Sequence, residues 1–465
     1  MGYSSTDHSL EIVMRKATAL LFASLLVLSP LSTLAASDTE RIQMLEQQLR
    51  QQQQVLDAMR QELERLKAGE DSLVQAGTAA PGEQDRARAE QEPELAQTRG
   101  DASLNVYGHI QLDAIYDFKR VDPTWESTLR PSTIPTVEDT FGADGNTIIS
   151  VKQTQFGFKG TTPTPLGEMK SWFEFDFFGT GSDAGDTKFN LRHAWIELGS
   201  LGFGQTNSNF MDISIFPNVV DWWGPAGMVF NRNAQIRYSW AVDDSAQFAI
   251  AAEKPNGSFN SGEFGEISPG FDDIVKARTR YPDITARWRD DYDWGHYQVA
   301  AVLRYLEIEA RGIADAPSPE NETGWGINLT GVINTVGRDQ LKLGLVHGEG
   351  IASFFNDGGV NLAPEDNRAE AVPITGVTAY YDRYWSSEWS SSIGFSVNDA
   401  DPRKQQAADE FDSGVYASVN LLYTPYPELL IGPEFLYGKH EDVGGRSGED
   451  YRLQFTLKHK LGRTF

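Results

Sequence analysis

The end of the chain, residues 451–465, reads YRLQFTLKHKLGRTF, and this stretch decides the fold. Its apolar side chains stand on odd positions, at Leu453, Phe455, Leu457 and Leu461, and the residues between them are Arg452, Gln454, Thr456 and Lys458. Side chains along a β-strand alternate between its two faces, so the stretch predicts a strand with one apolar and one polar face. An amphipathic edge strand of a soluble β-sandwich would show the same pattern, and this stretch alone leaves both interpretations open.

A strand that ends on an aromatic residue, here Phe465, resembles the closing strand of bacterial outer-membrane β-barrels, which characteristically ends in Phe. His459 and Arg463 depart from that pattern, because they stand on the apolar face where hydrophobic residues are usual. In such a barrel alternate side chains face lipid and a wet lumen, and the sheet closes so that no edge is left unpaired in the membrane.

The start of the chain has the features of a secretory signal peptide over residues 1–36. A basic pair at 15–16 precedes the apolar run 17–28, and the small-residue segment 33–36 follows it. Charged, apolar and cleavage regions in this order direct a protein to export, and Met14 is an alternative start. The run is too short for a permanent span, and no other window approaches about 18 apolar residues. The sequence therefore predicts an exported protein without a transmembrane helix.

Composition narrows the classes of function. Cysteine is absent, so an exported chain of 465 residues must rely on its own hydrogen bonds and packing. The net charge is −26, with no basic patch that would indicate nucleic acid. Metal-binding, nucleotide-binding and hydrolase motifs (HExxH, the Walker loop and GxSxG) do not occur. The sequence indicates no cofactor and no enzyme. The carboxylates Glu174 and Asp176 share one face of a strand, as a glycosidase pair could, but we interpret them as electrostatic lining.

Residues 38–67 are predicted to form a coiled coil that joins copies of the chain. Its core positions alternate three and four residues apart, at Ile42, Leu45, Leu49, Gln52, Leu56, Met59, Leu63 and Leu66. The narrow seam with polar flanks favours self-association over a single amphipathic helix, and it does not decide between dimer and trimer. Residues 68–100 lack periodicity and are predicted to be a flexible acidic linker.

Residues 101–465 change to short alternating segments, which we predict to form an all-β, 16-stranded antiparallel transmembrane barrel. The expected strands lie near 104–118, 149–160, 171–177, 188–198, 202–206, 233–240, 246–253, 283–289, 297–305, 324–333, 340–347, 374–385, 389–398, 412–424, 429–439 and 451–465. Short connections alternate with long acidic ones, near 120–147, 254–277, 307–323, 348–372, 399–411 and 440–449. An even strand count puts both ends of the barrel on one side, expected to be the periplasm, where the coiled coil would lie.

One long connection is apolar rather than acidic. Residues 204–233 read GQTNSNFMDISIFPNVVDWWGPAGMVFNRN, and their large apolar side chains would be costly on an exposed tip. We expect this loop to fold into the lumen as a constriction; the alternative is packing on a neighbouring subunit. The candidate constriction residues are Phe210, Asp212, Asp221, Trp222 and Trp223.

The same segment carries a family resemblance. The runs Phe203-Gly204-Gln205, Asn209-Phe210-Met211-Asp212, Trp223-Gly224-Pro225, Arg232 and Gln235-Ile236-Arg237-Tyr238 resemble DcaP-type porins, as do Val106-Tyr107-Gly108 and Gln155-Phe156-Gly157-Phe158. The resemblance covers essentially the whole chain. It implies a signal peptide, an N-terminal coiled coil, a homotrimeric outer-membrane barrel, and passive uptake of small anionic solutes, particularly carboxylic acids, through a lumen with arginines.

Arginines on the polar faces of the predicted strands would point into that lumen. The candidates for the solute pathway are Arg192, Arg232, Arg237, Arg287, Arg289 and Arg304. Arginine stays charged and binds carboxylates through paired hydrogen bonds, so several weak sites in a narrow pore would concentrate anions. The alternative is that these arginines only pair with lumen acids such as Glu174 and Asp176 and brace the barrel.

The sequence thus predicts a porin in the bacterial outer membrane, in contact with its lipid and lipopolysaccharide. Peptidoglycan is a further candidate partner, through the coiled coil. The first alternative is a secreted all-β protein with a coiled-coil stalk that binds or acts on polysaccharide. The second is a structural tether, in which the coil binds the cell wall and the barrel only anchors it.

Overall fold

The computed structural model describes residues 102–464 apart from 268–270, 312–319 and 367. The predicted signal peptide (1–36), coiled coil (38–67) and linker (68–100) and the final Phe465 lie outside the described residues. No helix among the described residues is long and apolar enough to cross a membrane.

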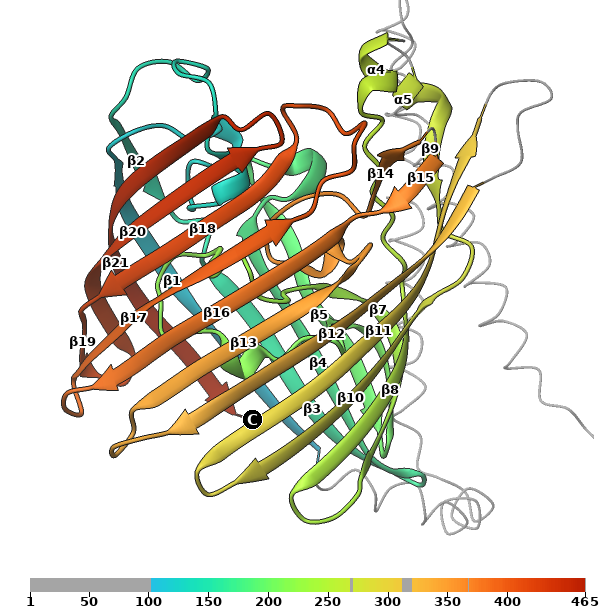
Figure 1. Ribbon diagram of the computed structural model, residues 1–465. Helices are drawn as coiled ribbons and strands as arrows, with labels where there is room; N and C mark the ends of the chain where they lie inside the picture. Colours follow the sequence, from blue (N-terminus) through green and yellow to red (C-terminus); the bar gives the residue numbers. More distant parts are fainter. Residues whose placement is uncertain (1–101, 268–270, 312–319, 367, 465) are drawn as a thin grey trace, which may run out of the picture. The chain divides into compact units, whose positions relative to one another are not determined.

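The described chain forms a closed antiparallel barrel of 16 transmembrane strands, as predicted (Figure 1). Three of these strands consist of two consecutive segments, and each complete strand is called a stave below. In chain order the staves are β1 (Ser103–Asp117), β2 (Asn146–Ser150) continued by β3 (Gln155–Thr164), β4 (Gly167–Phe178), β5 (Thr187–Leu198), β6 (Leu201–Asn207), β7 (Arg232–Ala241), β8 (Ala246–Glu253), β9 (Val275–Arg278) continued by β10 (Asp283–Tyr292), β11 (Gly295–Ala310), β12 (Glu320–Asn334), β13 (Gln340–Glu349), β16 (Pro373–Tyr384), β17 (Trp389–Ala400), β18 (Phe411–Asn420) continued by β19 (Leu422–Tyr426), β20 (Leu429–Asp442) and β21 (Ser447–Thr464).

The last stave closes the barrel against the first. β21 pairs with β1 from Arg452 opposite Asp117 to Thr464 opposite Asn105. Along β21, Phe455 is 48% exposed on the outside, whereas Gln454 is fully buried inside. The predicted alternation is confirmed from Arg452 to Lys458, whereas residues 459–464 are all exposed. It follows from the pleat of a strand between an apolar and a polar surrounding.

The connections differ between the two rims. At one rim the turns are short, for example residues 165–166 and 427–428, and aromatic side chains stand near them on the outside, such as Trp294, Trp385 and Trp389. Aromatic rings at this height are typical of the membrane interface of outer-membrane barrels.

The connections at the other rim are longer and contain the minor elements of the fold. These are β14 (Leu362–Glu365) paired with β15 (Arg368–Ala371), the short helices α4 (Glu263–Ile267) and α5 (Phe271–Ile274), and the 3-10 turns η2 (Pro123–Trp125), η3 (Pro131–Thr133), η4 (Gly181–Asp183), η5 (Ile213–Ile215) and η6 (Ala352–Phe354). Two predicted loops are shorter than expected, because β11 continues to Ala310 and β20 to Asp442. Beyond the apolar belt these strands carry polar side chains, but their backbones stay paired with the neighbouring strands. The sequence pattern alone indicated a loop there.

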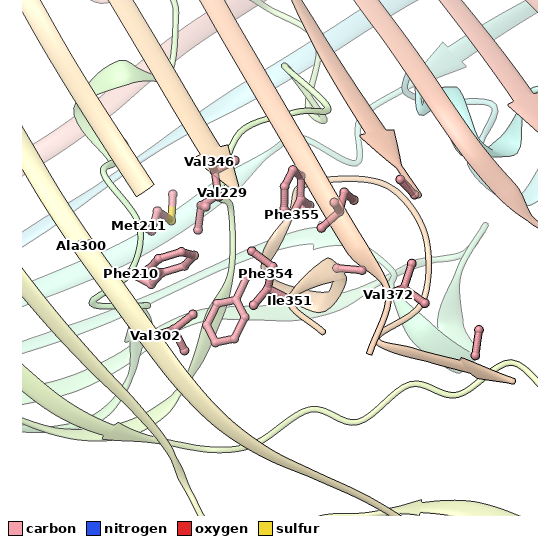
Figure 2. Packing of buried hydrophobic residues seen from close by; sticks show 14 residues of the cluster. Phe210, Met211, Val229, Ala300, Val302, Val346, Ile351, Phe354, Phe355 and Val372 are labelled. Carbon is pink, nitrogen blue, oxygen red and sulfur yellow. The ribbon is translucent and has the colours of Figure 1, made fainter. Parts of the chain in front are cut away.

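The interior is partly packed rather than open throughout. Phe210, Met211 and Val229 lie inside the barrel against Ala300 and Val302 of β11 and against the connection 350–372, which contributes Ile351, Phe354 and Phe355 (Figure 2). All of these side chains are at most 5% exposed. Apolar packing therefore fills the lumen on the β11–β16 side, and the water-accessible space described below lies mainly along the opposite wall.

Candidate functional site

Residues 208–231, here called the inner loop, cross the inside of the barrel. Hydrogen bonds join its backbone to side chains around the wall: Asn209 N–H to Glu253 of β8, the carbonyl of Phe210 to Asn328 of β12, the carbonyl of Phe216 to Lys342 of β13, Asn218 N–H to Asp382 of β16, and Gly227 N–H to Ser396 of β17. The inward course predicted from its apolar composition is confirmed. A loop held at so many points has one defined position.

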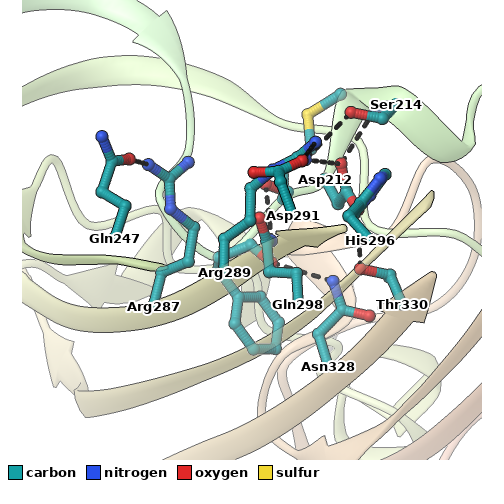
Figure 3. A network of polar contacts seen from close by, with 12 residues as sticks. Asp212, Ser214, Gln247, Arg287, Arg289, Asp291, His296, Gln298, Asn328 and Thr330 are labelled. Carbon is teal, nitrogen blue, oxygen red and sulfur yellow. Dashed lines mark hydrogen bonds and ion pairs between the residues drawn. The ribbon is translucent and has the colours of Figure 1, made fainter. Parts of the chain in front are cut away.

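Asp212 is the first main anchor of the inner loop (Figure 3). Its carboxylate lies 3.3 Å from Nη1 of Arg289, 2.9 Å from Nε2 of His296 and 2.8 Å from the hydroxyl of Thr330. Burial alone would raise the pKa of Asp212, but the contacts with His296 and Thr330 and the charge of Arg289 lower it to about 2. Because the pKa is depressed, the anchor is intact at neutral pH and is lost only as the pH falls toward that value.

Asp221 is the second anchor. Its Oδ1 accepts from the hydroxyl of Thr128 at 2.8 Å and from the N–H of Leu129 at 3.1 Å, and the hydroxyl of Tyr416 donates to Oδ2 at 3.2 Å. Its own N–H donates to Glu434 of β20 at 3.0 Å. Burial raises the pKa of Asp221 against the opposing effects of the charge of Arg452 and of the hydrogen bonds from Thr128 and Leu129. Asp212 and Asp221, both candidate constriction residues from the sequence, are buried in the structure and attach the inner loop to the wall.

The two tryptophans of the inner loop form an aromatic cluster inside the lumen, near the rim with the long connections. Trp222 stacks on Phe178 with ring centres 4.0 Å apart, and its Nε1 donates to Asp176 at 3.0 Å. The guanidinium carbon of Arg130 lies 4.7 Å from the ring centre of Trp223 and 4.9 Å from that of Trp125, and the two rings meet edge to face. The cluster fixes one wall of the open space.

Two water-accessible cavities adjoin the inner loop. The larger, of about 1030 Å³, runs along the β1–β7 wall and is lined at different depths by Trp125, Arg130, Arg192, Arg232 and Lys458. The smaller, of about 200 Å³, is lined by Trp172, Trp195, Arg237, Arg287 and Arg289. Both contain charged groups and aromatic faces, the composition of a site for polar solutes.

Three of the six predicted pathway arginines are neutralised by acids. Arg192 binds both Glu174 and Asp176 at 2.8 Å, and Arg289 binds Asp212 and Asp291. The carboxylates proposed as lumen lining thus form a network with one cation.

Arg304 is the third neutralised arginine and lies apart from the other five. Its side chain is fully buried, its Nε lies 3.1 Å from Asp283, and it lines neither cavity. The structure gives it the bracing role that the sequence left open as the alternative.

The other three predicted arginines line the cavities without an acid partner among the described residues. Arg232 lies over the ring of Phe230 at 4.7 Å, and its Nε has no hydrogen-bond partner within the described part of the chain. Arg237 bonds to Gln235 and to the carbonyl of Asn207. Arg287 donates to Gln247 at 2.7 Å, and no described residue forms a hydrogen bond with its Nε. No carboxylate among the described residues neutralises these three guanidinium groups.

Sequence reasoning missed two cations of the larger cavity. Lys458 lies on the polar face of β21 and makes no ion pair among the described residues, and the alternation rule used for the arginines would have found it. Arg130 lies in the connection between β1 and β2 and pairs with Asp357 at 2.8 Å. No pattern in the sequence indicates that this loop residue turns inward. Within the described part of the chain, no group of His, Asp and Glu side chains is arranged to hold a metal ion.

Comparison with known proteins agrees with this architecture. Residues 33–460 match the family model described as DcaP outer membrane protein. The crystal structure of the outer membrane channel DcaP of Acinetobacter baumannii is similar with a TM-score of 0.66 and 21% sequence identity, over 78% of this chain and 98% of that one. The anion-selective porin from Comamonas acidovorans gives a TM-score of 0.51 and 10% identity, over 78% of this chain and 100% of that one. At these identities the likeness concerns the fold. No curated protein matches the chain.

Proposed function

This chain belongs to the DcaP outer membrane protein family, and from that premise we propose that its barrel is a passive diffusion channel selective for small anionic solutes such as carboxylic acids. One observation carries the proposal. Arg232, Arg237 and Arg287 line the cavities beside the inner loop and are not ion-paired with acids among the described residues.

The electrostatics of these groups supports anion passage. A cation next to water and enclosed by a low-dielectric wall attracts an anion more strongly than it would in bulk solvent. Guanidinium groups also fit carboxylates through two parallel hydrogen bonds. The sites are separate and partly solvated, so each binds weakly and a solute can move from one to the next, as conduction requires.

Reversal potentials in planar bilayers test the proposal. With a salt gradient across a membrane holding the purified protein, we expect a potential of the sign given by anion flux. The salt should consist of an anion and a cation with equal mobility in water, so that unequal diffusion in bulk solution contributes nothing to the measured potential. A cation-selective potential contradicts the proposal, and a complete lack of conductance would favour the structural tether instead.

The secreted polysaccharide protein is not supported by the architecture. Its outer surface would be polar, whereas the closed barrel here presents exposed apolar side chains on its outside, such as Leu303, Ile327 and Leu345, on successive staves. Such a belt needs lipid around it. The barrel is that of an outer membrane porin, a family of channels rather than enzymes.

We further infer a homotrimer in which residues 38–67 form a periplasmic coiled coil, after removal of the signal peptide 1–36, with 68–100 as a linker. The outer face of β3–β5 is suited to subunit contact. It carries a continuous aromatic surface made of Phe156, Phe158, Phe173, Phe175, Phe177 and Phe189. Large aromatic side chains contribute strongly to interfaces because they bury much area with little loss of freedom.

Removing two of these rings should weaken the trimer. Phe158 and Phe189 are 43% and 55% exposed on the isolated barrel, and truncating an aromatic side chain at an interface costs about 2 kcal/mol or more. In a Phe158→Ala, Phe189→Ala variant we expect the trimer band on gels of unheated protein to convert to monomer at a clearly lower temperature. The control Leu345→Ala, Phe395→Ala removes similarly exposed side chains from β13 and β17. Equal behaviour of the two variants would place the subunit contact elsewhere.

A further inference from the structure

Ile213 is an apolar side chain exposed inside the barrel. It is the first residue of η5 in the inner loop and is 45% exposed, whereas Asp212 before it and Ile215 after it are nearly fully buried. Ile213 also lines both cavities: the larger one together with Arg232, and the smaller one together with Arg287. The two cavities therefore meet at this side chain.

The surrounding contacts hold Ile213 in that position. Asp212 accepts from Ser214 N–H at 3.0 Å and caps the turn, and Ser214 also accepts from Arg289 of β10 at 3.1 Å. The carbonyl of Ile213 accepts from Phe216 N–H at 3.1 Å. Ile215 packs into a buried apolar cluster with Met228 and Val332. A residue whose neighbours are fixed on both sides presents its side chain to the lumen in one defined way.

The position of Ile213 between the two cavities has a chemical consequence. Arg232 on one side and Arg287 on the other are cations without acid partners among the described residues. An anion that moves between them passes an isoleucine, which offers it no hydrogen bond. A hydrated or hydroxylated anion gains nothing from that contact, whereas a hydrocarbon group gains free energy by leaving water.

We propose that Ile213 is a specificity-determining residue, which favours organic anions with an apolar body over equally charged hydroxylated anions. The inference deepens the proposed function and rests on it. It assigns charge selection to the arginines and discrimination among anions to one side chain of the inner loop.

Bi-ionic potentials with hexanoate and gluconate test the assignment, because these carboxylates share charge and carbon number and differ in hydroxyl groups. Ile213→Asn keeps a similar size and removes the apolar surface. We expect this variant to lower the hexanoate-to-gluconate permeability ratio about fourfold. That factor corresponds to the free energy gained when one methylene group leaves water, which the variant would no longer provide. Ile213→Val should keep most of the ratio. Val137→Asn, the same kind of change at an exposed loop residue that lines neither cavity, should have no effect.

A second variant tests the position independently of the preference among anions. Ile213→Trp should lower single-channel conductance by about half or more if the path passes this residue, because it narrows the passage. A wild-type channel without anion preference would defeat the proposed function, whatever the Ile213→Trp result. An anion-selective wild type whose permeability ratio is unchanged in Ile213→Asn overturns the present inference alone. Migration of unheated and heated protein on gels verifies that each variant is folded.

Discussion

The double variant Arg232→Gln, Arg287→Gln is expected to have an anion-to-cation permeability ratio about tenfold lower than that of the wild type. Each guanidinium lines one of the two cavities and is not neutralised by a carboxylate among the described residues. A unit charge about 4 Å from a permeating ion contributes about 1 kcal/mol even at the dielectric constant of water. The loss of two such charges therefore exceeds the 1.4 kcal/mol that corresponds to a factor of ten. Reversal potentials in a salt gradient measure the ratio directly.

A matched control separates position from net charge. Arg338→Gln combined with Arg311→Gln removes two exposed arginines that line neither cavity, so the ratio should stay near that of the wild type. The salt dependence gives a second check, because dissolved ions screen the two lumen charges and the difference between variants should shrink as salt rises. An unchanged ratio in the double variant would mean that other groups, such as Lys458, set the selectivity.

The fold was predictable from the sequence because a membrane barrel repeats one rule along its length. Every stave separates lipid from lumen, so Phe455 and Gln454 of β21 reveal their faces by alternation alone, and all 16 predicted strands coincide with staves. The inner loop was predictable for a related reason. Its apolar side chains, such as Phe210, could not remain in water on an exposed tip.

The ion pairs inside the lumen were harder to predict from the sequence. Alternation along a strand shows on which face a residue lies, but it does not show which residue it contacts. Arg192 and Arg237 have the same sequence pattern, yet Arg192 lies across the sheet from two acids and Arg237 does not. That difference depends on register, including the irregularity between β4 and β5 at Glu174. The partners of Asp212 and Asp221 come from staves far along the chain, so their anchoring role also required the closed barrel.

Arg304→Met is expected to destabilise the barrel by about 3–5 kcal/mol, because it leaves the carboxylate of Asp283 buried without its cation. The guanidinium also donates to the carbonyl of Gly350 at 2.6 Å and to that of Asn256 at 2.5 Å, and it thereby joins β11 to two long connections. The free energy of unfolding in detergent, from denaturant titration, measures the loss.

The compensating change Asp283→Leu distinguishes a structural ion pair from a pathway residue. In the double variant Arg304→Met, Asp283→Leu both charges of the ion pair are removed, and apolar side chains of similar volume can replace a buried ion pair at little cost. We expect the double variant to be more stable than Arg304→Met by about 2 kcal/mol, with the remaining loss due to the carbonyl of Gly350, which loses its donor; the carbonyl of Asn256 still accepts from Asn361 and Ser353. The reversal potential should equal that of the wild type in both variants, since Arg304 lines neither cavity. A shift toward cations in the stable double variant would instead return Arg304 to the solute path.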